Sequence, residues 1–549
     1  MSHRLVLLLF AALRVSALWP LPQSLSTGST HLRLSPSFDI ALSGIDSPPA
    51  DLTDAISRTK QYLYNDKLQR LVVGRGANDA GVIASAASLE RLTLVFQGRE
   101  VASISKEAVA ELGTRMESYT LAIPADGSDA TVTANSTLGL FRGLTTFSQL
   151  WYDWEDRVYT PEAPVDIVDA PAYPYRGLML DTARNFFPVS DLKRTLDAMS
   201  WVKMSTFHWH VTDSQSFPLQ VAKFPGLSAK GAYSSSMTYS TADIEDIVAY
   251  AASRGIDVLV EVDTPGHSGI IAEAYPDHIA CSGATPWQDY AGEPPAGQLR
   301  VASSDTVNFT ASLVSAISSM FPSKYFSTGG DEINFNCYDQ DEVTQADLAA
   351  RGITITQALG LFTEATHGVL RAAGKTPVVW EEMLLDYNIT TLGNDTVVMV
   401  WLSSEHAAAV AERGFKFVHA ASDYFYLDCG AGEMLGNTVD QNSWCDPFKT
   451  WQKAYSFDPT ANLTEKQSRL VLGGQQLLWT EQSSPSNLDP IVWPRAAASA
   501  EVFWSGGGGN ETEALARLHD VGFRFRQRGV GAIVLQPLWC ALRPGLCNA

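Results

Sequence analysis

The chain has little positive charge for its size. Its 549 residues include 39 Lys and Arg against 60 Asp and Glu, which gives a formal net charge of −21 at pH 7. Nucleic acids and anionic membranes attract cationic surfaces, so this balance argues against both as partners. It suits a protein that works in an acidic setting or acts on neutral substrates.

Beyond its first residues, the chain has no apolar run of the roughly 20 residues that cross a bilayer. Its beginning combines basic Arg4, a short apolar run over residues 5–13 and the small residues Val15-Ser16-Ala17. This pattern predicts a signal peptide over residues 1–17, because a membrane anchor would have to be longer. We expect a secreted protein, extracellular or delivered to a lysosome or vacuole.

Several motifs of cofactor-dependent and nucleophilic enzymes are missing. There is no Cys-x-x-Cys, no His-Glu-x-x-His, no Gly-x-Ser-x-Gly, and Gly506–Gly509 precedes no Lys-Ser/Thr pair. These absences argue against a zinc ribbon, a zinc protease, a serine hydrolase and a phosphate-binding loop. We therefore expect neither a metal nor an organic cofactor.

Cysteine is scarce but even in number. Among the 15 ways to join six cysteines, we predict the sequential pairing Cys281–Cys337, Cys429–Cys445 and Cys540–Cys547. Disulfides agree with secretion. So do six Asn-x-Ser/Thr sites, most of which we expect to carry glycans; they begin at Asn135, Asn308, Asn388, Asn394, Asn462 and Asn510.

Residues 18–170 predict a smaller α+β domain. Helical patterns surround Ala55–Leu63 and Leu138–Trp151, and Arg91–Gln97 alternates like a strand. Two further alternating runs flank Asp-Gly-Ser-Asp and predict a hairpin over residues 119–134. The proline-rich run Tyr159–Tyr175 reads as a linker.

Residues 171–549 predict a (β/α)8 barrel. Eight short apolar runs alternate with helical patterns such as Ser190–Met204 and Thr241–Arg254, the latter with Thr241 as its N-cap. The expected strands are Arg176–Asp181, Thr206–Val211, Asp257–Val262, Tyr325–Gly329, Pro377–Trp380, Val397–Trp401, Lys416–His419 and Leu470–Gly474.

Polar and aromatic residues follow nearly every expected strand. They are Asp181, Asp213, Asp263, Asp331, Glu332, Trp380, Glu381, Trp401, Tyr426, Asp428, Trp479 and Glu481. A barrel gathers all strand ends on one rim, where barrel active sites lie, whereas a doubly wound open sheet would not. Carboxylates that bind hydroxyls, beside indoles that stack on sugar rings, indicate a carbohydrate pocket.

His208, His210 and Asp213, or Asp263 and His267, offer a competing metal reading. However, His208 and His210 point to the same face of one strand. We therefore interpret the two histidines as structural residues inside the barrel.

Eight segments of the chain form an ordered set of motifs: RGLMLDTARNFFP (176–188), HWHVTDSQSFP (208–218), VEVDTPGHSG (260–269), GGDE (329–332), VVWEE (378–382), YFYLD (424–428), GGQQLLWTE (473–481) and WPRAAASAEVFWS (493–505). Through these segments and their order, the chain resembles the glycoside hydrolase family 20 β-N-acetylhexosaminidases of the secreted fungal and animal type. The N-terminal region is similar to the family's α+β domain.

The resemblance implies an exo-hydrolase that removes terminal β-linked GlcNAc or GalNAc with retention, by substrate-assisted catalysis. It assigns Glu332 as general acid and base, Asp331 as the residue that orients the acetamido group, and Tyr426 as donor to its oxygen. Asp213 and His267 would support Glu332. The implied substrate-binding residues are Arg176, Trp380, Trp401, Asp428, Trp479 and Glu481, and a homodimer is a further implication.

Two expectations concern the acids themselves. An ionised Asp331 would raise the pKa of neighbouring Glu332, and Gly329 and Gly330 would leave room for the sugar ring. The chain also departs from many relatives at Asn185, Ser214, Gln475 and Glu381. These departures put leaving-group preference and pocket polarity in question rather than the reaction.

Two alternatives stay open on the sequence. One is a non-catalytic sugar-binding relative, which would not need an acid at Glu332. The other is a two-carboxylate barrel glycosidase acting on sugars that lack the acetamido group.

Overall fold

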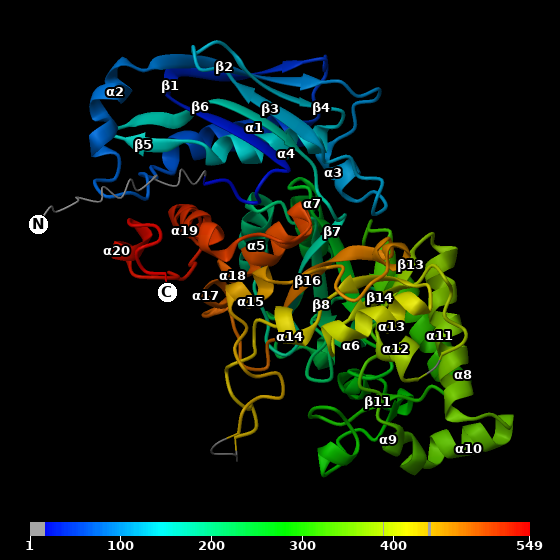
Figure 1. Cartoon of the computed structure of the whole chain (residues 1–549). Coiled ribbons are helices and arrows are strands. Elements are labelled where there is room, and N and C mark those ends of the chain that lie inside the picture. Colours follow the sequence, from blue (N-terminus) through cyan, green and yellow to red (C-terminus); the bar gives the residue numbers. More distant parts are fainter. Residues whose placement is uncertain (1–16, 388, 437–440, 549) are drawn as a thin grey trace, which may run out of the picture.

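The computed structural model describes residues 17–387, 389–436 and 441–548. The predicted signal peptide therefore lies almost wholly outside the described residues, as does the glycosylation site Asn388. Figure 1 shows two parts, a sheet covered by helices and a larger barrel surrounded by helices. No helix in the described ranges has both the length and the apolarity to cross a bilayer.

The N-terminal part is a six-stranded sheet in the order β1-β2-β4-β3-β6-β5. Its strands are β1 (Ser24–Ser43), β2 (Ala87–Phe96), β3 (Tyr119–Ile123), β4 (Ala130–Ala134), β5 (Tyr152–Trp154) and β6 (Arg157–Asp169). The helices α1 (Ala50–Asn65) and α4 (Thr137–Gln149) bury apolar faces with this sheet. The predicted α+β architecture is confirmed, including the antiparallel pair β3 and β4.

The linker prediction for Tyr159–Tyr175 is wrong. Most of that run is β6, which pairs antiparallel with both β1 and β3. The register between β1 and β6 shifts between two pairs of residues: Thr27 pairs with Val165, and Thr30 pairs with Ala163. Such an irregularity accommodates Pro164, which has no backbone N–H to donate to the ladder.

The predicted barrel is confirmed: eight parallel strands close in the order β12-β13-β14-β15-β16-β7-β8-β9. They are β7 (Tyr175–Asp181), β8 (Thr206–Thr212), β9 (Asp257–Val262), β12 (Tyr325–Ser327), β13 (Thr376–Trp380), β14 (Val397–Val400), β15 (Lys416–His419) and β16 (Val471–Leu478). Nearly all strand residues are buried, as expected for parallel strands covered by helices.

Element ends differ slightly from the predictions. The helix α7 (Thr241–Ala252) is capped by Ser240, which forms a capping box with Asp243, so the N-cap prediction for Thr241 is wrong by one residue. The helix α5 (Val189–Trp201) stops before Met204, where Lys203 adopts φ +58°. β12 stops at Ser327, because Gly329 and Gly330 adopt positive φ angles.

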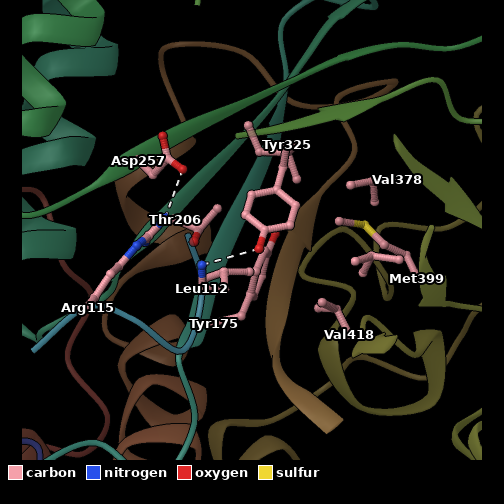
Figure 2. Close-up of a pocket in the computed structure, with 11 residues that line it drawn as sticks. Leu112, Arg115, Tyr175, Thr206, Asp257, Tyr325, Val378, Met399 and Val418 are labelled. Atoms are coloured by element: carbon pink, nitrogen blue, oxygen red, sulfur yellow. Dashed lines mark hydrogen bonds and ion pairs between the residues drawn. The ribbon is translucent and has the colours of Figure 1, made fainter. Parts of the chain in front are cut away.

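The N-terminal domain closes the amino-terminal end of the barrel (Figure 2). Arg115 donates to Asp257 at 2.9 Å, and the Tyr325 hydroxyl accepts from the Leu112 amide at 3.2 Å. The Arg115 and Asp257 side chains are almost fully buried. The opposite, carboxyl-terminal end of the barrel is therefore the one left for a substrate.

Candidate active site

Asp331 and Glu332 lie just after β12 and diverge. Asp331 is 6% exposed, whereas 38% of the Glu332 side chain is exposed. Glu332 adopts φ +50°, a left-handed conformation that costs a non-glycine residue about 1–3 kcal/mol and is characteristic of functional sites. The backbone thus sends one carboxyl into the barrel and the other toward its opening.

The two glycines before Asp331 do not leave room for a sugar ring, contrary to the prediction. A Cβ on Gly329 would lie 1.9 Å from an oxygen of Asp263, and one on Gly330 would lie 2.5 Å from Met383. The Gly330 amide also donates to Asp263 at 2.8 Å. These glycines instead let Asp263 approach the backbone beside Asp331.

His267 lies among three carboxylates. Its Nδ1 is 3.2 Å from Asp213, and its Nε2 is 3.7 Å from Asp331 and 3.4 Å from Glu332. Burial favours the neutral imidazole, but the charges of Asp213 and Asp331 outweigh it and raise the pKa of His267 well above its usual value. His267 therefore carries a positive charge beside Glu332.

The positive charge of His267 reverses the direction of the pKa shift predicted for Glu332. Burial raises the pKa of Asp331, and the nearby Asp263 carboxylate raises it further. Partial burial acts in the same direction on Glu332, but the hydrogen bond to His267 and its charge outweigh it, so the pKa of Glu332 is lowered. The expectation that Asp331 raises the pKa of Glu332 is wrong.

Asp213 contacts His267, and it is itself held by His210 and Arg184. It accepts from His210 at 2.8 Å, and Arg184 Nη2 lies 3.0 Å from it. His210 also contacts Glu261 at 2.6 Å, and His208 contacts the other oxygen of Glu261 at 3.1 Å. His208 and His210 are both fully buried, where their ring nitrogens have protein partners.

Three tryptophans and Tyr426 form the walls of the site. Trp401 and Tyr426 stack nearly parallel, with ring centroids 6.3 Å apart and an interplanar angle of 12°. Trp380 and Trp479 are 6.3 Å apart, and Trp479 is 6.4 Å from Tyr426. The predicted wall residues are therefore brought together, and the Trp380 amide donates to the Gly329 carbonyl, two residues before Asp331, at 3.1 Å.

The prediction for Arg176 is wrong. It is the second residue of β7, so it lies at the closed end of the barrel, where it is fully buried and donates to Glu117 at 2.6 Å. Arg184, eight residues later and beyond the carboxyl end of β7, occupies the rim instead. Its guanidinium lies over the Trp479 ring, donates to Glu293 at 2.7 Å and lies 3.9 Å from Glu481.

The predicted acids Asp428 and Glu481 also lie on the rim. Asp428 accepts from the Trp479 amide at 3.4 Å, and burial raises its pKa to about 7. Burial also raises the pKa of Glu481 well above its usual value. Asp263, His267 and Asp331 are close enough to hold a cation, but His267 already uses both ring nitrogens toward carboxylates.

Two loops border the opening of the active site, and neither was predicted from the sequence. The exposed Trp444 ring lies nearly perpendicular to Trp401 and Tyr426, with ring centroids 5.6 and 5.8 Å away. Residues 281–297 bring Gly292 so close to Glu332 that a Cβ there would lie 2.2 Å from its carboxylate. Neither loop has a periodic pattern that could have revealed this position.

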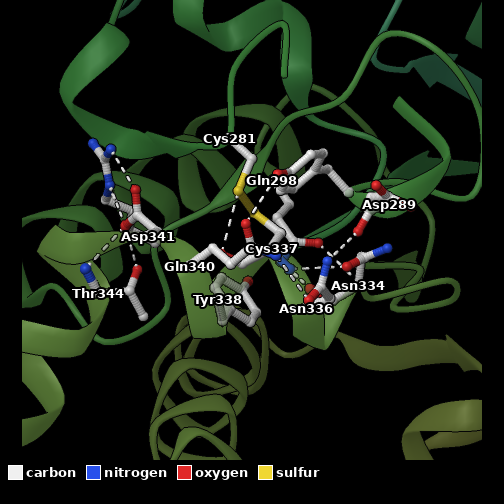
Figure 3. The surroundings of a disulfide bond; sticks show 12 residues. Cys281, Asp289, Gln298, Asn334, Asn336, Cys337, Tyr338, Gln340, Asp341 and Thr344 are labelled. Carbon is white, nitrogen blue, oxygen red and sulfur yellow. Dashed lines mark hydrogen bonds and ion pairs between the residues drawn. A yellow bond between two sulfur atoms is a disulfide. The ribbon is translucent and has the colours of Figure 1, made fainter. Parts of the chain in front are cut away.

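The Cys281–Cys337 disulfide fastens the second loop (Figure 3). Cys337 belongs to α9 (Phe335–Gln340), which begins three residues after Glu332. Asn336 donates to the Asp289 carbonyl at 2.7 Å, and the Tyr290 hydroxyl donates to Gln340 at 2.9 Å. All three predicted disulfides are present, the others being Cys429–Cys445 and Cys540–Cys547.

The predicted glycosylation sites Asn135, Asn308, Asn394, Asn462 and Asn510 are all exposed. Asn510 additionally caps α19 (Glu511–Gln527) through its side-chain oxygen, which leaves its nitrogen unused in that contact.

Comparisons with known proteins agree with this geometry. Residues 173–507 match the family model for the glycosyl hydrolase family 20 catalytic domain, and residues 18–150 match a β-acetylhexosaminidase-like model. A β-hexosaminidase of Arthroderma benhamiae is 31% identical over 97% of this chain and 98% of its own length.

Two further relatives extend the comparison. A chitooligosaccharidolytic β-N-acetylglucosaminidase of Ostrinia furnacalis is 36% identical over 78% of this chain and 75% of its own. Among solved structures, a chitobiase of Flavobacterium johnsoniae superposes with a TM-score of 0.75 at 26% identity, covering 94% of this chain and 73% of that one.

Proposed function

Because the chain belongs to glycosyl hydrolase family 20 and is an exo-β-N-acetylhexosaminidase, we propose that it removes terminal β-linked GlcNAc from chitooligosaccharides. The proposed reaction is retaining and substrate-assisted, with the 2-acetamido oxygen attacking the anomeric carbon. The single observation that supports this most is the divergence of the buried Asp331 and the half-exposed Glu332.

Glu332 is the proposed general acid and base. It lies nearest the opening, where the leaving oxygen must be protonated and where water must later enter. Asp331 lies deeper, beside the aromatic walls, and is assigned to the acetamido N–H. Tyr426 is the donor to the acetamido oxygen, which it would polarise as the oxazolinium-like intermediate forms.

The remaining groups bind the sugar. Trp380, Trp401 and Trp479 are assigned to the acetamido methyl and the ring face. Arg184, rather than Arg176, joins Asp428 and Glu481 at the hydroxyls remote from the reaction, because it projects from the rim beside Glu481. Asp213 fixes His267, and His267 orients Glu332.

An oligomeric substrate is favoured by the leaving-group side of the opening. Trp444 is 63% exposed and lies nearly perpendicular to Trp401, and its exposed indole is the proposed platform for a second sugar. Glu293 lines the same pocket as Glu332 and accepts a hydrogen bond from Arg184. A relative of this chain is described as chitooligosaccharidolytic, which agrees with this assignment.

The decisive experiment compares nitrophenyl β-GlcNAc with nitrophenyl β-glucoside. Wild-type turnover of the first alone is expected, with strong losses in Glu332→Gln and Asp331→Asn. Turnover of the glucoside would favour a two-carboxylate glycosidase, and binding without any turnover would favour a sugar-binding protein. A thiazoline that mimics the cyclised acetamido group should inhibit strongly, and weak inhibition would count against substrate assistance.

We further propose that the protein is secreted after removal of residues 1–17. The three disulfides and the exposed glycosylation sites support this proposal. N-terminal sequencing of protein collected from the culture medium tests it, and a chain that begins before Leu18 would contradict the predicted cleavage.

A further inference from the structure

The adjacent acids Glu381 and Glu382 accept hydrogen bonds from two different nitrogen atoms of Trp401, one of the pocket walls. Glu381 accepts a hydrogen bond from the backbone N–H of Trp401 at 2.9 Å, and Glu382 accepts one from its indole N–H at 2.7 Å. Both acids follow β13, whereas Trp401 follows β14. The contact therefore joins the ends of two neighbouring barrel strands and fixes Trp401 in position and in ring orientation.

This double contact distinguishes Trp401 from the other two indoles. The indole nitrogen of Trp380 has no hydrogen-bond partner among the described residues. Trp479 is anchored to Asp428 through its backbone amide. A side-chain carboxyl that dictates the angle of the ring is thus specific to Trp401 within this set of walls.

Both acids are removed from solvent, and neither is assigned to a contact with the sugar. Glu381 is fully buried, and its second oxygen contacts His406 at 2.6 Å. Glu382 is 5% exposed, and burial followed by the charge of Asp331 raises its pKa to about 9. A neutral Glu382 still accepts the indole hydrogen bond, so the contact survives at neutral pH.

The position of Trp401 controls the space in front of Tyr426. The two rings are nearly parallel, and Trp444 packs against both. Loss of the Glu382 hydrogen bond would leave a buried indole N–H without a partner, which is unfavourable and favours a rotated ring. A rotated ring would widen the space between Trp401 and Tyr426.

We propose that Glu381 and Glu382 are positioning residues that fix Trp401 and thereby set the size of the 2-acyl group that the pocket accepts. The inference rests on the proposed function, in which Trp401 and Tyr426 enclose the acetamido group. Neither acid contacts the reacting atoms in this assignment, so both act through the tryptophan.

The test measures kcat/KM for nitrophenyl β-glucosaminides that carry either an N-acetyl or an N-propionyl group. Wild type should strongly prefer N-acetyl. Glu382→Asp, which withdraws the carboxyl by one methylene, and Glu381→Ala should each reduce this preference by about tenfold, the equivalent of about 1.4 kcal/mol. Glu382→Gln should keep the preference, because its amide oxygen still accepts the indole hydrogen bond.

Two comparisons separate positioning from general destabilisation. Glu405→Gln, an exposed acid in the same region, should leave the preference unchanged. Adding Glu382→Asp to Trp401→Phe should change it no further, because phenylalanine has no N–H to hold. An equal additional loss in that double variant would overturn the inference.

The outcomes also separate the inference from the function on which it rests. A wild-type preference that persists in both Glu382→Asp and Glu381→Ala, with folding verified by circular dichroism, overturns the inference alone. Wild-type inactivity on the N-acetyl substrate would overturn the proposed function and the inference with it.

Discussion

The imidazole of His267 and the carboxylate of Glu332 lie 3.4 Å apart, and both residues adopt left-handed backbone conformations, at φ +45° and +50°. A cation is therefore held next to the proposed general acid by backbone geometry that few residues tolerate. The arrangement favours ionised Glu332 in the free protein, although the acid step requires its protonated form.

The first prediction concerns the pH profile. Replacing His267 by Asn removes the charge that lowers the pKa of Glu332. The pKa of Glu332 should then rise, so protonated Glu332 should persist to higher pH. We expect the alkaline limb of the pH profile of kcat/KM to shift to higher pH, while kcat itself falls. A limb that stays in place would show that His267 does not tune Glu332.

The second prediction separates two arginines. Arg184→Lys removes the planar fork beside Trp479 and Glu481 and should lower kcat/KM at least tenfold, mainly through KM. Arg176→Lys disturbs the buried contact with Glu117 and should lower the melting temperature with little effect on KM. A raised KM in Arg176→Lys, with little change in Arg184→Lys, would instead indicate that Arg176 binds the substrate.

The third prediction concerns the second sugar. Trp444→Ala should raise KM for chitobiose and chitotriose several-fold, because stacking on an indole face is lost. KM for a methyl β-GlcNAc glycoside should change little, since this substrate has no second ring. Equal effects on all three would mean that Trp444 supports Trp401 rather than the leaving sugar.

The fourth prediction uses the raised pKa of Glu382. A buried acid whose folded pKa is about 9 keeps its proton in the folded state, while the unfolded chain releases it above about 4.5. Its contribution to stability is therefore complete below pH 4.5 and is lost as the pH rises toward 9. Glu382→Gln should raise the melting temperature relative to wild type more at pH 8 than at pH 5. Glu405→Gln, which changes an exposed acid in the same region, is the matched control.

The fifth prediction concerns the disulfide beside the site. Replacing Cys281 and Cys337 together by Ser opens a covalent loop that spans 56 residues, which costs about 4 kcal/mol in the chain-entropy estimate. Residues 281–297 should then fluctuate beside Glu332. We expect a lower melting temperature and a higher KM for chitobiose. A double variant at Cys540 and Cys547 should leave KM unchanged, because that loop is short and terminal.

The barrel could be predicted from the sequence because its strands are buried on both faces and read as short apolar runs. The rim residues could be predicted for the same reason, since they follow the ends of those runs. Arg176 lies at the start of β7, which is the end of the barrel opposite the rim. Arg184 follows the carboxyl end of β7 and therefore lies on the rim.

Other features were outside the reach of sequence patterns. Trp444 and Glu293 belong to loops whose positions depend on tertiary contacts and a disulfide. β6 was hidden because Pro161 and Pro164 suggested a linker, whereas an irregular register absorbs Pro164. The charge on His267 depends on how Asp213 and Asp331 are placed around it, which spacing along the chain does not give.

The way the N-terminal domain closes the amino-terminal end of the barrel has a consequence for engineering. Glu117 neutralises both Arg142 and Arg176, and Arg115 neutralises Asp257. A barrel cut out at the proposed boundary of residue 171 would lose the partners of Arg176, Lys203 and Asp257, which pair with Glu117, Asp169 and Arg115 in the intact chain. A minimal catalytic module would thus need new residues at these three positions, and grafting the active site alone would not transfer a stable enzyme.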